Sequence, residues 1–88
     1  MRGGVRIPVE GGPERLAPAD GKHFSLEELQ DAVGGYIELV AIPAVPRAVL
    51  IVDEDGLRKR LPANDVATYL AQQRVVGPVV MCARALLR

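Results

Sequence analysis

The chain has 88 residues, and eleven basic side chains balance eleven acidic ones, which gives a formal net charge of zero. We expect residues 1–88 to form one domain with a small core, and the charge balance argues against a dedicated nucleic-acid-binding protein, whose affinity comes from neutralising phosphates. Apolar residues make up 49% of the chain while Trp is absent, so the core is expected to consist of aliphatic side chains, which offer few platforms for stacking bases or flat cofactors.

Residues 1–23 are expected to contain N-terminal strands and turns. Apolar and other side chains alternate in residues 5–9, which predicts a strand in which Pro8 is confined to an edge of the sheet or to the end of the paired register. Residues 11–13 favour a turn, and residues 14–17 can return as a short second strand. We therefore expect two strands before the first helix.

The signals for a first helix are complete at both ends. Ser25 can cap the first turn, and Glu28 can return a bond to the Ser25 backbone, which is the capping-box arrangement. Phe24 and Leu29 occupy the two positions of a hydrophobic staple. Gly34 can adopt the left-handed conformation that ends a helix. The sequence therefore predicts an amphipathic helix over residues 26–33.

Apolar runs predict two interior strands after this helix, at residues 36–42 and 48–52. The Asp-Gly pair at the end of residues 53–56 favours a hairpin turn. In residues 57–61, alternation along a strand would put Arg58 and Arg60 on one face and the two leucines on the other, which predicts a return strand with a solvated polar face.

A second helix and a last strand complete the predicted fold. Asn64 or Asp65 can cap a helix that runs to about residue 73, and residues 75–83 predict a strand with an irregular start at Gly77. These elements predict an α+β fold: a mostly antiparallel sheet of five to six strands with two short helices packed on one face. One apolar face of such a sheet stays uncovered, which predicts a homodimer.

The sequence does not contain a recognisable set of catalytic or metal-binding side chains. His23 is the single imidazole and Cys82 the single thiol, so we expect neither a hydrolytic triad nor a zinc site within one chain. The acidic turn at residues 53–56 is unlike a calcium loop, because Arg58 stands where the loop requires Gly. We therefore expect no enzymatic activity, no metal and no cofactor.

Two groups of residues are candidate binding sites. Polar groups at the strand ends could converge on a small ligand, and these residues are Tyr36, Glu38, Asp53, Glu54 and Asn64. Arg58 and Arg60 would share one face of the predicted strand and could contact the phosphates of a nucleic acid. A solvated face is the simpler interpretation of these two arginines, since no aromatic residues are interleaved with them.

The sequence also predicts a cytoplasmic protein that does not associate with membranes. A single cysteine, Cys82, excludes an intramolecular disulfide, so nothing indicates an oxidising compartment. The first residues lead into no apolar run of the kind found in a signal peptide. The longest nearly uncharged stretch, residues 75–83, is too short to span a bilayer.

Four segments together resemble the family of domains of unknown function DUF3846. The first helix runs into Val-Gly-Gly-Tyr-Ile-Glu, an acidic turn ends in Gly, Leu-Pro-Ala-Asn precedes the second helix, and the last strand begins Val-Gly-Pro-Val-Val. This likeness covers residues 24–80, the family-like core. Members of the family are small and mostly borne by phages and plasmids, and the family has no agreed reaction. The resemblance therefore implies an accessory protein of a mobile element.

The leading hypothesis is a non-enzymatic accessory domain that acts by binding another protein, such as a host protein, through a face or an edge of its sheet. It rests on a well-specified fold without a catalytic set of residues. The alternatives are a small-ligand-binding protein that uses the polar strand ends and a weak nucleic-acid binder that uses Arg58 and Arg60.

Overall fold

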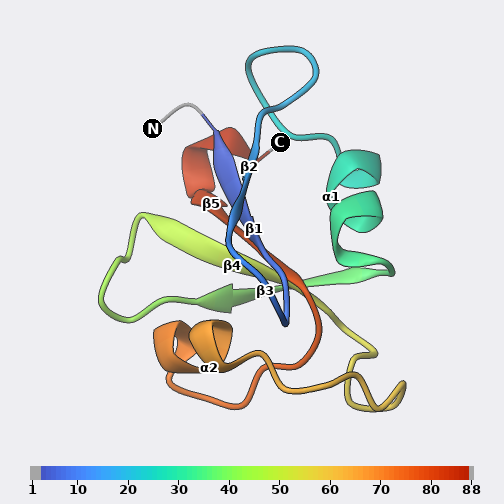
Figure 1. The fold of residues 1–88 in the computed structure, drawn as a ribbon. Coiled ribbons are helices and arrows are strands. Elements are labelled where there is room, and N and C mark those ends of the chain that lie inside the picture. Colours follow the sequence, from blue (N-terminus) through green and yellow to red (C-terminus); the bar gives the residue numbers. More distant parts are fainter. Residues whose placement is uncertain (1–2, 88) are drawn as a thin grey trace.

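The fold is an α+β arrangement built around one antiparallel sheet. A computed structural model describes residues 3–87. The elements in chain order are β1 (Gly4–Ile7), β2 (Glu14–Leu16), α1 (Leu26–Val33), β3 (Ile37–Ala41), β4 (Ala48–Asp53), α2 (Asp65–Ala71), β5 (Val79–Ala83) and the 3₁₀ helix η1 (Arg84–Leu86). The strands pair in the order β2-β1-β5-β4-β3 (Figure 1), which confirms the predicted fold class.

Helix α1 begins and ends at the predicted residues. The Ser25 hydroxyl accepts a hydrogen bond from the Glu28 N–H at 3.1 Å, and the Glu28 carboxylate accepts one from the Ser25 N–H at 2.9 Å. The bond from the Ser25 backbone also lowers the pKa of Glu28. Phe24 and Leu29 are buried in one cluster, and Gly34 ends the helix with φ of 92°. The capping box, the staple and the C-cap are confirmed.

Replacing Ser25 with Ala is expected to lower the free energy of unfolding by about 1 kcal/mol, because the N–H of the third helical residue loses its acceptor. Thermal unfolding followed by circular dichroism measures this as a midpoint about 4–8 °C lower. Ser25→Asp is the matched control, since a carboxylate can accept the same bond. Equal midpoints for Ser25→Ala and the unchanged protein would contradict a stabilising role for the cap.

The two helices cover opposite faces of the sheet (Figure 1). Leu50 and Val52 of β4 lie in a cluster with buried residues of α2, whereas Val49 and Ile51 lie in a cluster with buried residues of α1. The prediction that both helices pack on one face is therefore wrong. A strand that is apolar on both sides needs a cover on each of them, and each helix supplies one.

The covered faces remove the main argument for a homodimer. Within residues 3–87, both sides of the central strands are buried in one chain, and the four residues 49–51 and 80 are 0% exposed. No uncovered apolar sheet face therefore demands a second copy. A dimer would have to use another part of the surface, such as an edge of the sheet.

The predicted strand at residues 57–61 is a helical turn instead. The Gly56 carbonyl accepts a hydrogen bond from the Leu61 N–H, and the Leu57 carbonyl accepts one from the Arg60 N–H. Both bonds are 3.1 Å long. Arg60 has φ of 58°, so this turn ends in a Schellman motif with a left-handed residue that is not glycine. A strand needs a neighbouring strand to accept and donate its backbone hydrogen bonds. Here the backbone hydrogen bonds form within the segment instead.

The last strand begins at Val79, later than predicted. Residues 72–78 form an irregular connection in which Val76 makes an isolated bridge with Ala63, and Gly77 has φ of 77°. A Cβ on Gly77 would lie 2.7 Å from the Leu61 side chain, so this position needs glycine for space as well as for conformation. This connection forms one wall of the pocket described next.

Candidate functional site

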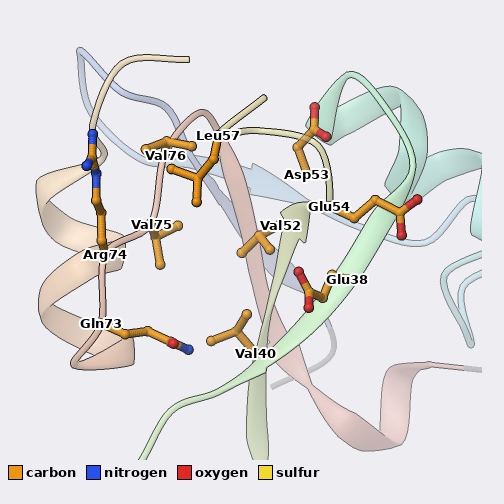
Figure 2. Close-up of a pocket in the computed structure, with 10 residues that line it drawn as sticks. All are labelled: Glu38, Val40, Val52, Asp53, Glu54, Leu57, Gln73, Arg74, Val75 and Val76. Atoms are coloured by element: carbon orange, nitrogen blue, oxygen red, sulfur yellow. The ribbon is translucent and has the colours of Figure 1, made fainter. Parts of the chain in front are cut away.

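A pocket of about 220 Å³ opens on the α2 side of the sheet, between the strands β3 and β4 and the connection that precedes β5 (Figure 2). We call it the β3/β4 pocket. Polar and apolar side chains contribute equally to its lining. The lining residues are Glu38, Val40, Val52, Asp53, Glu54, Leu57, Gln73, Arg74, Val75 and Val76.

Glu38 has a polar side chain that points into this pocket. It pairs across the ladder with Val52, so it faces the α2 side, and its carboxylate points toward the middle of the lining residues in Figure 2. Arg74 lies on the opposite side, and Glu54 lies at the rim with its carboxylate directed outward. Within residues 3–87, none of these three side chains makes an ion pair or a side-chain hydrogen bond. They are therefore available to a ligand or a partner.

Asp53 lines the same pocket, but its carboxylate points away and is committed elsewhere (Figure 2). This side chain is 1% exposed, and it accepts hydrogen bonds from Lys59 Nζ at 2.7 Å and from the Asp55 N–H at 2.8 Å. Burial opposes its ionisation, yet these two bonds and the Lys59 charge together hold the pKa of Asp53 below its ordinary value. Asp53 therefore anchors the turn that follows β4.

Gly35 makes room for this ion pair. A Cβ at this position would lie 2.5 Å from Lys59 Nζ and 2.9 Å from Asp53 Oδ2. The pair thus packs against the chain just after α1. This contact explains physically why two glycines follow the helix: Gly34 supplies the left-handed conformation, and Gly35 supplies the space.

The Asp53–Lys59 pair predicts a defined response to acid. The pKa of Asp53 is lower in the folded protein than in the unfolded chain, where it is about 4. The ionised carboxylate therefore stabilises the fold at pH values above about 4. This stabilisation is lost as the pH falls from about 4 toward the pKa of the folded protein. Asp53→Asn should lower the free energy of unfolding by about 1–2 kcal/mol at neutral pH. The deficit should shrink as the pH falls below the ordinary pKa of an aspartate, because the folded carboxylate becomes protonated only below that value.

Urea unfolding of both proteins across this pH range measures the deficit. Asp31→Asn is the matched control, because Asp31 is an exposed acid on α1. If the free energies of unfolding of Asp53→Asn and of the unchanged protein differed by the same amount at every pH, this role of the carboxylate would be ruled out.

Tyr36 and Arg58 lie at a second, shallower depression of about 520 Å³ between the end of α1 and the 54–60 turn. Arg58 pairs with the Asp55 carboxylate at 3.3 Å, and the hydrogen bond from Arg58 to Asp55 raises the pKa of Arg58. Arg60 occupies the left-handed position of the turn. The prediction that Arg58 and Arg60 share a strand face is therefore wrong.

Asn64 is a structural residue and lies outside both depressions. It is 1% exposed, its Oδ1 accepts the Ala67 N–H at 3.1 Å, and its Nδ2 donates to the carbonyls of Ile7 at 3.0 Å and Gly77 at 2.9 Å. Every polar atom of the side chain is thus used within the fold. Of the five residues predicted to bind a ligand, only Glu38, Asp53 and Glu54 line one pocket.

The sequence analysis missed the wall formed by residues 73–76, which includes Arg74. The sequence predicts that residue 73 ends the second helix and that residues 75 and 76 begin the last strand, and it gives Arg74 no role. The break at Gly77 and Pro78 is the signal that could have separated them, because a strand interior excludes this dipeptide.

β3 is an open edge of the sheet, so the prediction that residues 36–42 form an interior strand is wrong. The Tyr36 carbonyl accepts from the Glu54 N–H at 3.0 Å, and in an antiparallel ladder such bonding positions alternate along the strand. The backbone groups of Ile37, Leu39 and Ala41 therefore point outward, away from β4. None of these outward groups has a hydrogen-bond partner within residues 3–87.

An apolar groove of about 210 Å³ runs beside this edge on the α1 side of the sheet. Leu26 of α1 is 59% exposed and Leu39 of β3 is 50% exposed. The groove is lined by Phe24, Leu26, Leu29, Ile37, Leu39 and Leu87. An exposed apolar groove beside an open strand edge is a typical site for an added strand.

The opposite edge of the sheet is better protected. β2 has only three residues, and two of them are the exposed, charged Glu14 and Arg15. Short, charged edge strands discourage pairing with another chain. The β3 edge is thus the more accessible of the two.

No group of three or more His, Cys, Asp or Glu side chains in residues 3–87 could hold a metal ion. Neither helix in this range has the length and apolar character needed to cross a membrane.

Comparison with known proteins places the chain in a family. Searches of the curated proteins and of the solved structures gave no significant match. A family profile described as "Domain of unknown function (DUF3846)" matches residues 2–85. The match includes the α1 cap, the two glycines, the turn anchored by Asp53 and the Asn64 cap. This chain therefore belongs to the DUF3846 family.

Proposed function

We propose that this protein is a non-enzymatic interaction domain that binds another protein by adding a strand to the β3 edge. One observation supports this most directly: the backbone groups of Ile37, Leu39 and Ala41 lie unpaired beside an apolar groove. An accessory role in the cytoplasm, in keeping with the resemblance to proteins of phages and plasmids, is part of the same proposal.

A proline in the edge strand tests this mode of binding. Ala41 is exposed and its N–H points outward, so Ala41→Pro removes a donor to the partner without removing a bond to β4. Ala41→Thr is the matched control, because it keeps the N–H. Affinity capture from lysate of the source cells should retain a partner on the unchanged protein and on Ala41→Thr, and should lose it on Ala41→Pro. Equal capture by all three would contradict edge addition.

The homodimer predicted from sequence becomes a second form of this proposal, in which the added strand comes from another copy. Sedimentation equilibrium at micromolar concentration measures it. A mass near twice the 9.4 kDa of one chain is the expected result for the dimer, and Ala41→Pro should return that mass to one chain. A mass of 9.4 kDa for the unchanged protein would exclude this form.

Binding of a small ligand in the β3/β4 pocket is the second candidate function. It is favoured because Glu38 points into a pocket that combines apolar and polar side chains and has Arg74 on its opposite side (Figure 2). Such a pocket fits a small zwitterion with an apolar body. Thermal unfolding in the presence of free amino acids should shift upward for the unchanged protein but not for Glu38→Gln. The absence of any shift would count against this candidate.

A further inference from the structure

We infer that the segment added to β3 carries a basic residue between two apolar residues, with the basic side chain opposite Glu38. This inference rests on the proposed edge addition and names the chemistry of the partner. It follows from the different character of the two faces that flank the β3 edge.

The α1 side of the edge is apolar. Ile37 and Leu39 face this side, and both line the groove together with Leu26 of α1. Half of the Leu39 side chain and more than half of the Leu26 side chain are exposed. Side chains of an added strand that point to this side would cover them, and apolar side chains are the ones that gain from that contact.

The α2 side of the edge is acidic. Glu38 faces this side, and Glu54 lies near it on the same face. Neither carboxylate is paired within residues 3–87, whereas Asp53 and Asp55 are already bound to Lys59 and Arg58. Residues directly opposite each other in a ladder have Cβ atoms about 5 Å apart. A Lys or Arg opposite Glu38 would therefore pair with it.

The same carboxylates disfavour a second copy of this chain. If two copies of β3 paired in antiparallel fashion about Leu39, each Glu38 would lie diagonal to the Glu38 of the other copy, on the same face of the sheet. Parallel pairing in register would bring them closer still. Like charges so placed oppose pairing, whereas a basic segment turns the same position into an attraction.

The experiment is a selection of random nine-residue peptides, displayed on phage, against the immobilised protein. Selected peptides should contain the apolar–basic–apolar triplet more often than the unselected library does. The most enriched peptide is then synthesised, and its Kd is measured by fluorescence anisotropy. Glu38→Gln should bind it roughly two- to fivefold more weakly, the factor expected for one cross-strand charge pair. Glu27→Gln is the matched control, because it removes an exposed charge of the same sign from α1.

Salt gives an independent measurement of the charge pair. Raising the ionic strength should weaken binding to the unchanged protein and to Glu27→Gln, but much less to Glu38→Gln, because salt screens an exposed ion pair. Binding should also slow hydrogen exchange at the amides of Ile37, Leu39 and Ala41. This exchange measurement replaces Ala41→Pro if that variant does not fold.

The outcomes separate the inference from the function on which it rests. Peptides that protect the β3 amides but show no basic preference, or that bind Glu38→Gln with unchanged Kd, would overturn the inference and leave edge addition standing. A dimer that Ala41→Pro dissociates would also overturn it, since the edge would then hold a second copy. If no peptide is enriched, or if binding leaves the β3 amides unprotected, both the inference and the proposed function fail.

Discussion

Replacing Asn64 with Ala is expected to lower the free energy of unfolding by about 3–4 kcal/mol. Losing an N-cap costs about 1 kcal/mol, and each buried polar group left without a partner costs about 1–3 kcal/mol. The Asn64 side chain is buried and serves the Ala67 N–H and the carbonyls of Ile7 and Gly77 at once. In a domain of this size the unfolding midpoint should fall by more than about 12 °C.

Two further variants separate the cap from the other bonds of Asn64. Asn64→Asp keeps the oxygen that accepts from Ala67 N–H but cannot donate to Ile7 or Gly77, so it should also be clearly destabilised. Val66→Ala changes a residue of the same helix that is 55% exposed, and it should alter stability by less than about 0.5 kcal/mol. An Asn64→Asp protein as stable as the unchanged one would show that only the cap matters.

Leu50→Ala and Ile51→Ala are each expected to lower the free energy of unfolding by about 2–5 kcal/mol, the usual cost of truncating a large buried aliphatic side chain. Both residues are 0% exposed, although they are neighbours on β4 and point to opposite faces of the sheet. A comparable loss at both positions is the result expected when each face of the sheet is covered by one helix. Urea unfolding measures both variants.

Leu39→Ala serves as the control for these core variants, because Leu39 is 50% exposed on the edge strand. Its cost should stay below about 1 kcal/mol, since little surface is removed from water when this residue folds. If either Leu50→Ala or Ile51→Ala left stability unchanged, one sheet face would be open. That result would support the arrangement predicted from the sequence, in which both helices pack on one face.

The sequence by itself determined the limits of α1 and the interior position of β4, whereas it wrongly predicted an interior strand at residues 36–42. The signals for α1 act over short distances: the Ser25–Glu28 bonds span three residues, and Gly34 ends the helix through its own backbone conformation. β4 was equally clear because every residue from Ala48 to Val52 is apolar. Local interactions of this kind can be read from neighbouring residues alone.

The residues of the candidate sites were harder to predict, because most of them come together through contacts between distant parts of the chain. Glu38 and Glu54 were predicted to lie together, and they do line one pocket. Arg74 and the groove beside Leu39 were missed because they depend on contacts between distant parts of the chain. Asn64 was misplaced for the same reason, since its amide bonds to Ile7, fifty-seven residues away.

Only the tertiary structure decided which face each helix covers and which strand lies at the edge. The continuous apolar run of β4 predicts that both of its sides are buried, but it does not say which element covers each side. The order β2-β1-β5-β4-β3 places the last strand of the chain in the centre and β3 at the edge. That order is set by pairing between β1 and β5, more than seventy residues apart, and no local pattern encodes such a contact.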